Sequence, residues 1–207
     1  MDRPLARDEQ RPADQDRPPA AAVRRLAAAR LARRPLVASV DVEIRPLGGD
    51  DVDALQRLLE LDPGYSERVT GYPPGPSDAL SALISRPETV TEDHKHGHGL
   101  WLDGALTAFI DTVEGYPDDL TATIGLVMVA PAARREGFGT RLHDAVMREM
   151  HQRGIRTMRM PIVATVATDA EPFARSAGYR PTGEVKEHRY SQLESTVAIW
   201  SRSCGAD

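Results

Sequence analysis

One stretch of this sequence constrains the fold more than any other. An apolar run, Thr121–Val129, leads through a proline-containing turn into a segment whose apolar residues recur with helical period, at Phe138, Leu142, Ala145, Val146 and Met150. A second apolar run, Thr157–Val163, follows that helical segment at 137–152. A strand–helix–strand succession usually returns the second strand parallel to the first. The sequence therefore predicts a mixed α/β fold with a parallel step.

Weaker patterns predict the elements that precede this stretch. Residues 42–47 alternate as in a short strand. A helix should follow, capped by Asp50 or Asp51 and ended by the Asp-Pro-Gly sequence at 62–64. Ser77 should cap a second short helix, whose inward positions are expected at the apolar residues Leu80, Leu83 and Ile84.

The remaining strands are placed by turn residues. Asp103-Gly104 separates 99–102 from 105–113, and this dipeptide is a strong signal for a two-residue hairpin turn. Near the C-terminus the pattern predicts a short helix and two closing strands, at 169–177, 179–186 and 196–201. The predicted order is β-α-α-β-β-β-α-β-α-β-β, without an internal repeat.

Composition excludes several classes of protein. Hydrophobic residues make up 41% of the 207 residues, and no apolar run approaches the roughly 18 residues that span a bilayer. The single cysteine, Cys204, excludes an internal disulfide, and we expect it to be a bystander near a polar C-terminus. Without a secretory signal, we expect a reduced, cytoplasmic protein.

Charge divides the chain into two parts. Residues 1–40 carry nine Arg against five Asp or Glu, a net charge of +4, so the remaining chain carries −9 of the total of −5. The Pro- and Ala-rich segment 1–40 predicts a disordered extension outside a domain at 41–203. Its Arg-rich part at 20–34 leaves open a membrane-surface or nucleic-acid arm. The acidic body favours a cationic small molecule over nucleic acid or a membrane.

Two glycines at the start of the long helix point to chemistry. Gly137 and Gly139 allow close approach of a ligand to the backbone. The first turn of a helix carries unpaired N–H groups and the positive end of the helix dipole, a combination that binds phosphate. A P-loop is excluded because no Gly-Lys-Ser/Thr follows, and a dinucleotide fingerprint because Leu142 stands where its third small residue belongs.

The arrangement strand–Val–x–Pro–x–x–Arg–x–x–Gly–x–Gly–helix resembles the acyl-CoA-binding signature of the GNAT superfamily of N-acyltransferases. The matching residues are Val129, Pro131, Arg134, Gly137 and Gly139. The segment 170–179, a short helix that ends in Gly178-Tyr179, resembles the second block of that family. With the order of elements, the resemblance covers about 42–201.

The resemblance implies acetyl-CoA as acyl donor, without a metal. The CoA pyrophosphate would lie on the glycine-opened helix, and pantetheine along the preceding strand. The implied contacts are Val127, Val129, Arg134, Arg135, Glu136, Gly137, Phe138, Gly139 and Thr140. That strand splays from its parallel neighbour in this family, and Gly125 and Pro161 fit such a splay. The Val129 backbone N–H would serve as oxyanion donor.

The sequence departs from the family where proton transfer is concerned. The usual tyrosine acid falls at Ala174 and the usual asparagine at Ala167. Tyr179 or Ser176 are open substitutes, although packing and capping are the simpler roles for them.

For the proton acceptor, the candidates are Asp111, Glu114 and, near the last hairpin, His188. A solvated hairpin, for Asp111 and Glu114, and a surface position, for His188, are the simpler interpretations.

Other side chains suggest contacts without settling them. Tyr65 and Tyr72 fall in the region that lines the acceptor site in the resembled fold, where they would stack on an acceptor or anchor a loop. His94, His96 and His98 alternate, and we favour a mobile polar loop there over a metal site.

The resulting hypothesis is an N-acetyltransferase that acetylates a primary amine of a small molecule or peptide directly in a ternary complex, with a homodimer left open. The alternative hypothesis is an acyl-CoA-binding sensor without turnover.

Overall fold

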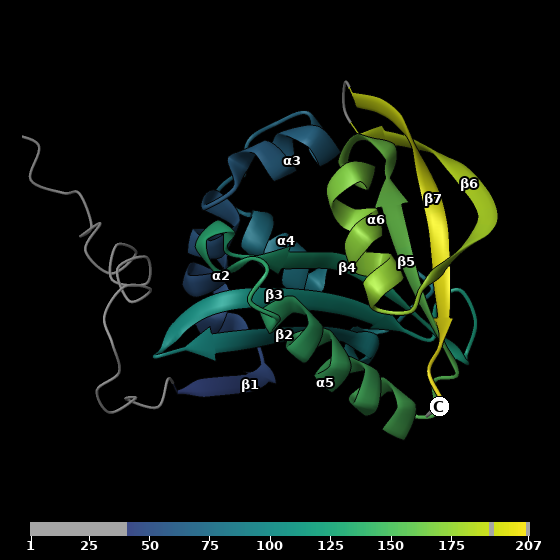
Figure 1. Cartoon of the computed structure of the whole chain (residues 1–207), viewed down its shortest axis with the longest axis horizontal. Helices are drawn as coiled ribbons and strands as arrows, with labels where there is room; N and C mark the ends of the chain where they lie inside the picture. Colours follow the sequence, from purple (N-terminus) through teal and green to yellow (C-terminus); the bar gives the residue numbers. More distant parts are fainter. Residues whose placement is uncertain (1–40, 191–192, 206–207) are drawn as a thin grey trace, which may run out of the picture. The chain divides into compact units, whose positions relative to one another are not determined.

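The computed structural model describes residues 41–190 and 193–205, where the chain forms a seven-stranded sheet of order β1-β2-β3-β4-β5-β7-β6 (Figure 1). Only β4 and β5 pair in parallel. The strands are β1 Val42–Pro46, β2 Lys95–Leu102, β3 Ala105–Glu114, β4 Thr121–Val129, β5 Thr157–Val163, β6 Arg180–Tyr190 and β7 Leu193–Ser203. The predicted mixed α/β fold is confirmed, whereas the extension predicted at 1–40 lies outside the described residues.

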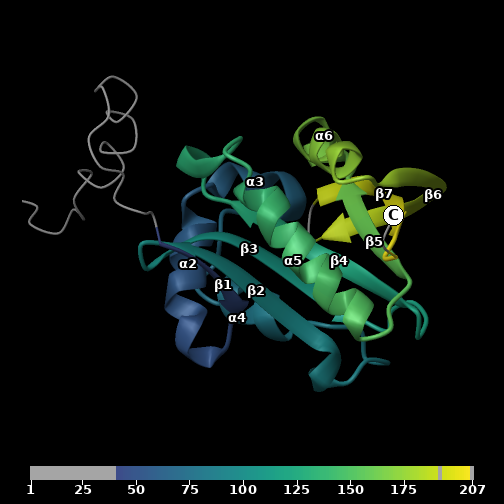
Figure 2. The ribbon, with the colours of Figure 1, turned by 60° about the horizontal axis from the view of Figure 1, so that its bottom comes forward.

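Helices cover both faces of the sheet (Figure 2). On one face α5 (Phe138–Gln152) packs against β2, β3 and β4, and α6 (Ala167–Ser176) packs against β5. On the other face α2 (Val52–Glu60) contacts β3, and α4 (Asp78–Ile84) contacts β2. Successive residues of β3 serve the two cores, since Ile110 joins the α5 cluster and Phe109 the α2 cluster.

Helix α2 forms as its apolar spacing predicts. Leu55, Leu58 and Leu59 recur on one face and are buried against the sheet. Burial of each such side chain stabilises the fold by about 1.5–3 kcal/mol. Short 3-10 turns connect other elements, η1 Gly49–Asp51, η2 Glu92–His94, η3 Pro131–Ala133 and η4 Ala164–Val166. Among the described residues no helix is both long and apolar enough to cross a membrane.

The Asp-Pro-Gly sequence at 62–64 does more than end α2. The prediction missed a further helix, α3 (Pro63–Thr70), which begins there. The Asp62 side chain accepts a hydrogen bond from the Tyr65 N–H at 3.2 Å, and Pro63 takes the first helical position. Gly71, with φ of +85°, closes the helix. The same three residues therefore end one helix and start the next.

The inward face predicted for α4 is partly wrong. Leu80 and Ile84 are 45% and 47% exposed, whereas Ala79 is completely buried. Ala79 lies against α2, where a larger side chain would hold the two helices apart.

The hairpin prediction is confirmed, and several strands are longer than predicted. Asp103 and Gly104 have φ of +47° and +78°, as a two-residue turn of type I′ requires. β2 begins at Lys95 rather than at 99. Cys204, expected near a polar terminus, is instead buried in the α5 core, where its Sγ lies 3.4 Å from the Met147 carbonyl oxygen. Pairing with a neighbouring strand, rather than the local sequence pattern, sets the ends of these longer strands.

Strand β6 forms one edge of the sheet and is irregular. Its register with β7 shifts between Pro181 and Val185, and Gly183 within this interval has φ of +85°. Pro181 has no amide proton to offer a further strand.

A neutral polar pair lies inside the α5 core. His143 is completely buried, and its Nε2 lies 3.0 Å from the Tyr179 hydroxyl. Burial lowers the pKa of His143, although Asp144 works in the opposite direction. Burial likewise raises the pKa of Tyr179. Both groups are therefore held in their neutral forms at neutral pH.

This burial predicts a pH dependence of stability. Burial also lowers the pKa of His98, more than Glu149 raises it. An unfolded histidine binds a proton near its ordinary pKa of about 6.5, while folded His143 and His98 bind it only at lower pH. The stability from neutral histidine is thus present above pH 6.5 and is lost on acidification. We expect the thermal unfolding midpoint to fall as pH decreases from about 7.5 to about 5.

The variant His143→Phe should show a shallower decline, because one of the two buried histidines is gone. His151, exposed on the same helix, provides the matched control His151→Phe, which should keep the wild-type slope. A slope unchanged in His143→Phe would contradict the assignment.

Candidate active site

The two parallel strands separate after a short contact. β4 and β5 pair only through Thr121–Thr157, Ala122–Met158 and Thr123–Arg159. Beyond these pairs β4 continues beside β3, and β5 beside β7. Gly125 and Pro161 each lie two residues past the last pair on their strand, where the sequence predicted irregularity. The expected splay is confirmed.

A bulge in β4 marks the start of the splay. Asp111 of β3 pairs with Leu126, but Thr112 pairs with Ile124, so Gly125 is an extra residue. The Gly125 N–H donates to Asp111 Oδ1 at 2.8 Å. A side chain at Gly125 would overlap this carboxylate, and glycine is therefore required here.

Backbone groups of β4 face the open side of the splay. The N–H of Ala130, just after β4, donates to the Thr107 carbonyl oxygen at 2.8 Å, toward β3. Because backbone groups alternate in direction along a strand, the N–H groups of Val129 and Val127 point the other way, toward β5. No β5 residue pairs with them. This edge can accept the backbone-like amides of an extended ligand.

The loop after β4 opens α5 in the way the glycine spacing predicts. Gly137 caps the helix with φ of +85°, and a Cβ there would meet no atom within 4 Å. The first helical bond runs from the Arg141 N–H to the Gly137 carbonyl. The N–H groups of Phe138, Gly139 and Thr140 precede it and have no helical acceptor. We call residues 135–140 the glycine entrance.

The glycine entrance lies directly on the end of β4. A Cβ at Gly139 would come within 3.2 Å of the Val129 side chain and 3.6 Å of Phe173 on α6. Glycine thus lets the first turn of α5 pack against the strand end and α6 together. An anion at the entrance would lie beside the open edge of β4, where N–H groups and the helix dipole favour negative charge.

Arg134 connects the strand end to helix α3. Its Nε donates to the Val129 carbonyl oxygen at 3.0 Å, and its guanidinium also binds the Asp62 carboxylate. Partial burial opposes ionisation, but Arg134 holds the pKa of Asp62 below its usual value. Asp62 is a residue that the sequence prediction missed, because its partner lies 72 positions away.

The candidate proton acceptors are all engaged, and they are not brought together. Asp111 is buried and its Oδ2 lies 2.8 Å from Lys95 Nζ. Glu114 bonds His96 at 2.8 Å. It pairs with Ala122, and at about 3.3 Å per residue this position is roughly 23 Å from Val129 along β4. His188 contacts the Val69 carbonyl oxygen at 2.9 Å.

Burial of Asp111 raises the pKa of its carboxyl, and Lys95 counteracts this. The solvated hairpin considered from the sequence is therefore wrong for Asp111. Lys95 is a second residue that the sequence prediction missed. Because side chains alternate along a strand, Lys95, Gly97 and Gly99 lie on the face opposite to the histidines, and this alternation was the signal that could have singled out Lys95.

The two tyrosines expected at an acceptor site differ in position. Tyr65 of α3 is half-buried and packs with the core under α2. Burial and the nearby Asp111 charge raise the pKa of Tyr65 to about 12, so its hydroxyl keeps its proton. Tyr72 is exposed on the loop after α3. Tyr65 therefore belongs to the same sheet face as Asp111, and Tyr72 to the surface.

Of the open substitutes for the family tyrosine, Tyr179 is buried on His143 and Ser176 donates to the Phe173 carbonyl oxygen at 2.8 Å.

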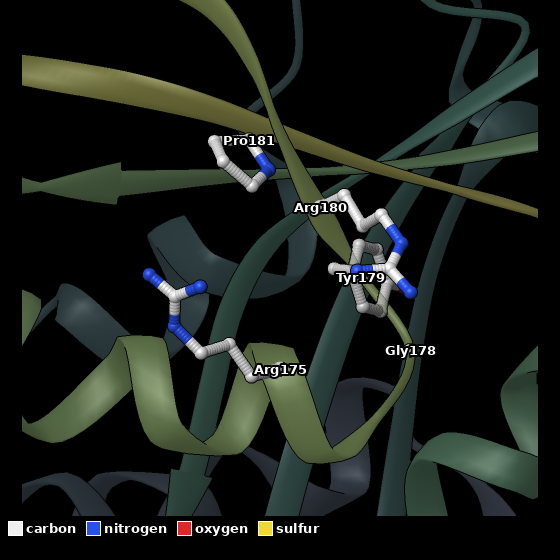
Figure 3. Close-up of a pocket in the computed structure, with 5 residues that line it drawn as sticks. All are labelled: Arg175, Gly178, Tyr179, Arg180 and Pro181. Carbon is white, nitrogen blue, oxygen red and sulfur yellow. The ribbon is translucent and has the colours of Figure 1, made fainter.

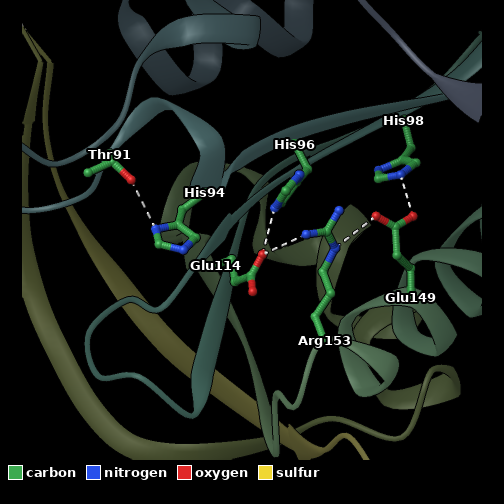
Figure 4. A network of polar contacts seen from close by, with 7 residues as sticks. All are labelled: Thr91, His94, His96, His98, Glu114, Glu149 and Arg153. Carbon is green, nitrogen blue, oxygen red and sulfur yellow. Dashed lines mark hydrogen bonds and ion pairs between the residues drawn. The ribbon is translucent and has the colours of Figure 1, made fainter.

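Two of the three alternating histidines, His96 and His98, lie on a strand rather than in a mobile loop, which corrects the prediction for them, while His94 lies in η2 just before it. His96 and His98 lie on β2 and bond Glu114 and Glu149, each at 2.8 Å. Arg153 joins the two carboxylates (Figure 4). In the described part of the chain, no group of three or more such side chains is arranged to hold a metal ion.

Two hollows on the surface lie away from the glycine entrance. The larger, about 430 Å³, is lined at the junction of α6 and β6 by Arg175, Gly178, Tyr179, Arg180 and Pro181 (Figure 3). Arg175 is already engaged there, over the Trp200 ring and in an ion pair with Glu171. The other, about 300 Å³, lies between α2 and the β2–β3 hairpin. Neither includes a predicted site residue apart from Tyr179, which is buried.

Solved structures share this fold. The ribosomal-protein-S18-alanine N-acetyltransferase from Escherichia coli is 19% identical, with 81% of this chain and 96% of that chain covered and a TM-score of 0.59. An N-acetyltransferase from Staphylococcus aureus Mu50 is 16% identical, with 80% and 99% covered and a TM-score of 0.62. An acetyltransferase from Thermus thermophilus is 20% identical, with 78% and 96% covered and a TM-score of 0.58.

The family model described as the acetyltransferase (GNAT) family matches residues 55–179, more than half of the chain. Among curated proteins, none matches this chain. The matched segment contains the splay, the bulge and the glycine entrance described above. The chain therefore belongs to the GNAT family of acetyltransferases.

Proposed function

We propose that this protein is an N-acetyltransferase that transfers the acetyl group of acetyl-CoA to a primary amine of a small molecule or peptide in the cytoplasm. One observation carries the proposal: the open edge of β4 runs directly into the glycine entrance of α5. An extended chain that ends in a diphosphate fits these two features together. Family membership supports acyl transfer as the reaction.

The donor is held mainly by backbone groups. The pyrophosphate is bound by N–H groups of residues 135–140 and by the positive end of the α5 dipole. The pantetheine amides pair with Val127 and Val129 as an added strand would. Arg134 contributes less, because its guanidinium is shared between Asp62 and the Val129 carbonyl.

The chemistry requires few side chains. The uncharged amine nitrogen attacks the thioester carbonyl carbon, and the N–H of Val129 stabilises the charge that develops on oxygen. The C–S bond then breaks to give the amide and a CoA thiolate. With Ala174 in place of the family tyrosine, water protonates this thiolate, whose pKa of about 8.5 makes it a tolerable leaving group. The amine proton leaves to water, because Asp111, the candidate acceptor beside the bulge, is held in a buried ion pair with Lys95.

The acceptor approaches from the face that carries Tyr65. A net charge of −9 outside residues 1–40 favours a cationic amine. The E. coli structure is that of a ribosomal-protein-S18-alanine N-acetyltransferase, which keeps a protein or peptide acceptor within the proposal.

A second function, acyl-CoA binding without turnover, is favoured by the engaged side chains. Asp111 is ion-paired and Ala174 offers no proton donor. Both functions require acetyl-CoA binding, so catalysis alone separates them.

We expect the protein to release CoA thiol from acetyl-CoA when a suitable amine is present. Panels of polyamines, aminoglycosides and peptides with a free N-terminus should be screened by thiol titration, and hits checked for the acetylated product by mass spectrometry. A matched panel of amides and alcohols serves as the control. Tight acetyl-CoA binding without CoA thiol release for any amine of the panel would favour the sensor function.

The glycine entrance is tested by Gly137→Val. Its left-handed φ strains a β-branched residue, and the side chain would fill the space reserved for phosphate. We expect acetyl-CoA affinity, measured by calorimetry, to fall at least about 10-fold, or about 1.4 kcal/mol.

Gly154 provides a matched control at the other end of α5, because it has φ of +95° and equally open surroundings. Gly154→Val should lower the stability of the fold by about as much as Gly137→Val does, and it should leave the acetyl-CoA affinity unchanged. Equal affinities for wild type and Gly137→Val would refute the phosphate site.

A further inference from the structure

A buried ion pair lies beneath the splay, on the sheet face that α2 and α4 cover. Lys95 of β2 and Asp111 of β3 are 4% and 6% exposed in their side chains, and Nζ lies 2.8 Å from Oδ2. Taking two charges out of water costs several kcal/mol per ion, and mutual attraction seldom exceeds that cost. Stability alone therefore does not explain why these two residues occupy a core position.

The other carboxylate oxygen explains the position. Asp111 Oδ1 accepts the N–H of Gly125 at 2.8 Å, and Leu126 follows Gly125 on β4. These two residues form the bulge, where the regular β3–β4 ladder is interrupted. The carboxylate thus supplies the acceptor that the interrupted ladder lacks. A bulge without an acceptor would leave buried N–H groups unpaired, at a cost of about 1–3 kcal/mol each.

The bulge also determines which way the following backbone points. One extra residue in β4 reverses the facing of every residue after it. Before the bulge, Ile124 packs with the α5 core, and after it Val127 and Val129 do so. Leu126 and Met128 instead pack with the α2 core. Loss of the bulge would shift this register and move the Val127 and Val129 N–H groups away from the splay.

We propose that Lys95 and Asp111 are positioning residues that lock the β4 bulge and thereby hold the Val127–Val129 edge in place for the acyl donor. The inference rests on the proposed function for the identity of the donor. Lys95 keeps the Asp111 carboxylate charged so that it accepts the Gly125 N–H of the bulge. In this role Asp111 takes no proton from the acceptor amine.

Within residues 41–190 and 193–205, few other groups face this carboxylate. Lys95 approaches from β2, Tyr65 from α3, and the Gly125 N–H from β4. Lys95 is the only full positive charge among them. Its removal leaves a buried, unpaired carboxylate, which either distorts the bulge or takes up a proton.

The test compares Lys95→Met with the double variant Lys95→Met/Asp111→Asn in the full-length protein. At pH 8 we expect Lys95→Met to bind acetyl-CoA at least about 10-fold more weakly than wild type. The loss should shrink at pH 6, because protonation removes the unpaired charge. The double variant should recover affinity to within about 3-fold and lose this pH dependence, since the Asn carbonyl still accepts a bulge N–H without charge.

Lys186 provides the matched control. It is the other lysine of the described chain and forms an exposed pair with Glu184. Lys186→Met should change neither affinity nor pH dependence.

Hydrogen exchange of residues 125–129 gives a readout that does not require acetyl-CoA. Exchange should rise in Lys95→Met and return toward wild type in the double variant. Unchanged exchange and affinity in Lys95→Met would overturn the proposal. So would a double variant that binds acetyl-CoA normally but loses about 100-fold in kcat, since this would make Asp111 the proton acceptor. If wild type binds no acetyl-CoA while exchange still responds, the proposed function fails and the locking role stands.

Discussion

The structure depends on a strand that is paired on one side only. Beyond Thr123, β4 has β3 as its partner and faces β5 across the splay without pairing. Unpaired backbone groups inside a fold are costly, so a chain keeps them only where a ligand or water takes the partner's place. The bulge at Gly125 and the glycine entrance at 135–140 bracket this edge. Most of the candidate site is therefore backbone.

The two faces of the sheet contribute different parts of the site. The α5 face supplies the helix N-terminus and Phe173, while the opposite face supplies Tyr65 and the Lys95–Asp111 pair. Arg134 reaches between them, from the Val129 carbonyl to Asp62 at the start of α3. One guanidinium thus connects the end of β4 with the start of α3.

Local sequence signals predicted the features that depend on the backbone preferences of glycine and proline. The hairpin at Asp103-Gly104, the helix opened by Gly137 and the splay marked by Gly125 and Pro161 each follow from what glycine or proline permits. What depends on long-range register escaped prediction. Lys95 and Asp111 meet only when β2 pairs with β3, and His98 meets Glu149 only when α5 lies across β2. Start and stop signals also overlap at 62–64, which concealed α3.

The irregular edge strand β6 has a consequence for association between copies. An exposed strand of eleven residues presents free backbone groups, and in many proteins such an edge recruits a strand from another molecule. Here Pro181 has no N–H to donate, and the backbone at Gly183, with its positive φ, interrupts the regular strand. Any incoming chain would also have to desolvate the alternating charges from Glu184 to Arg189. The sheet therefore ends in an edge that resists cross-β aggregation.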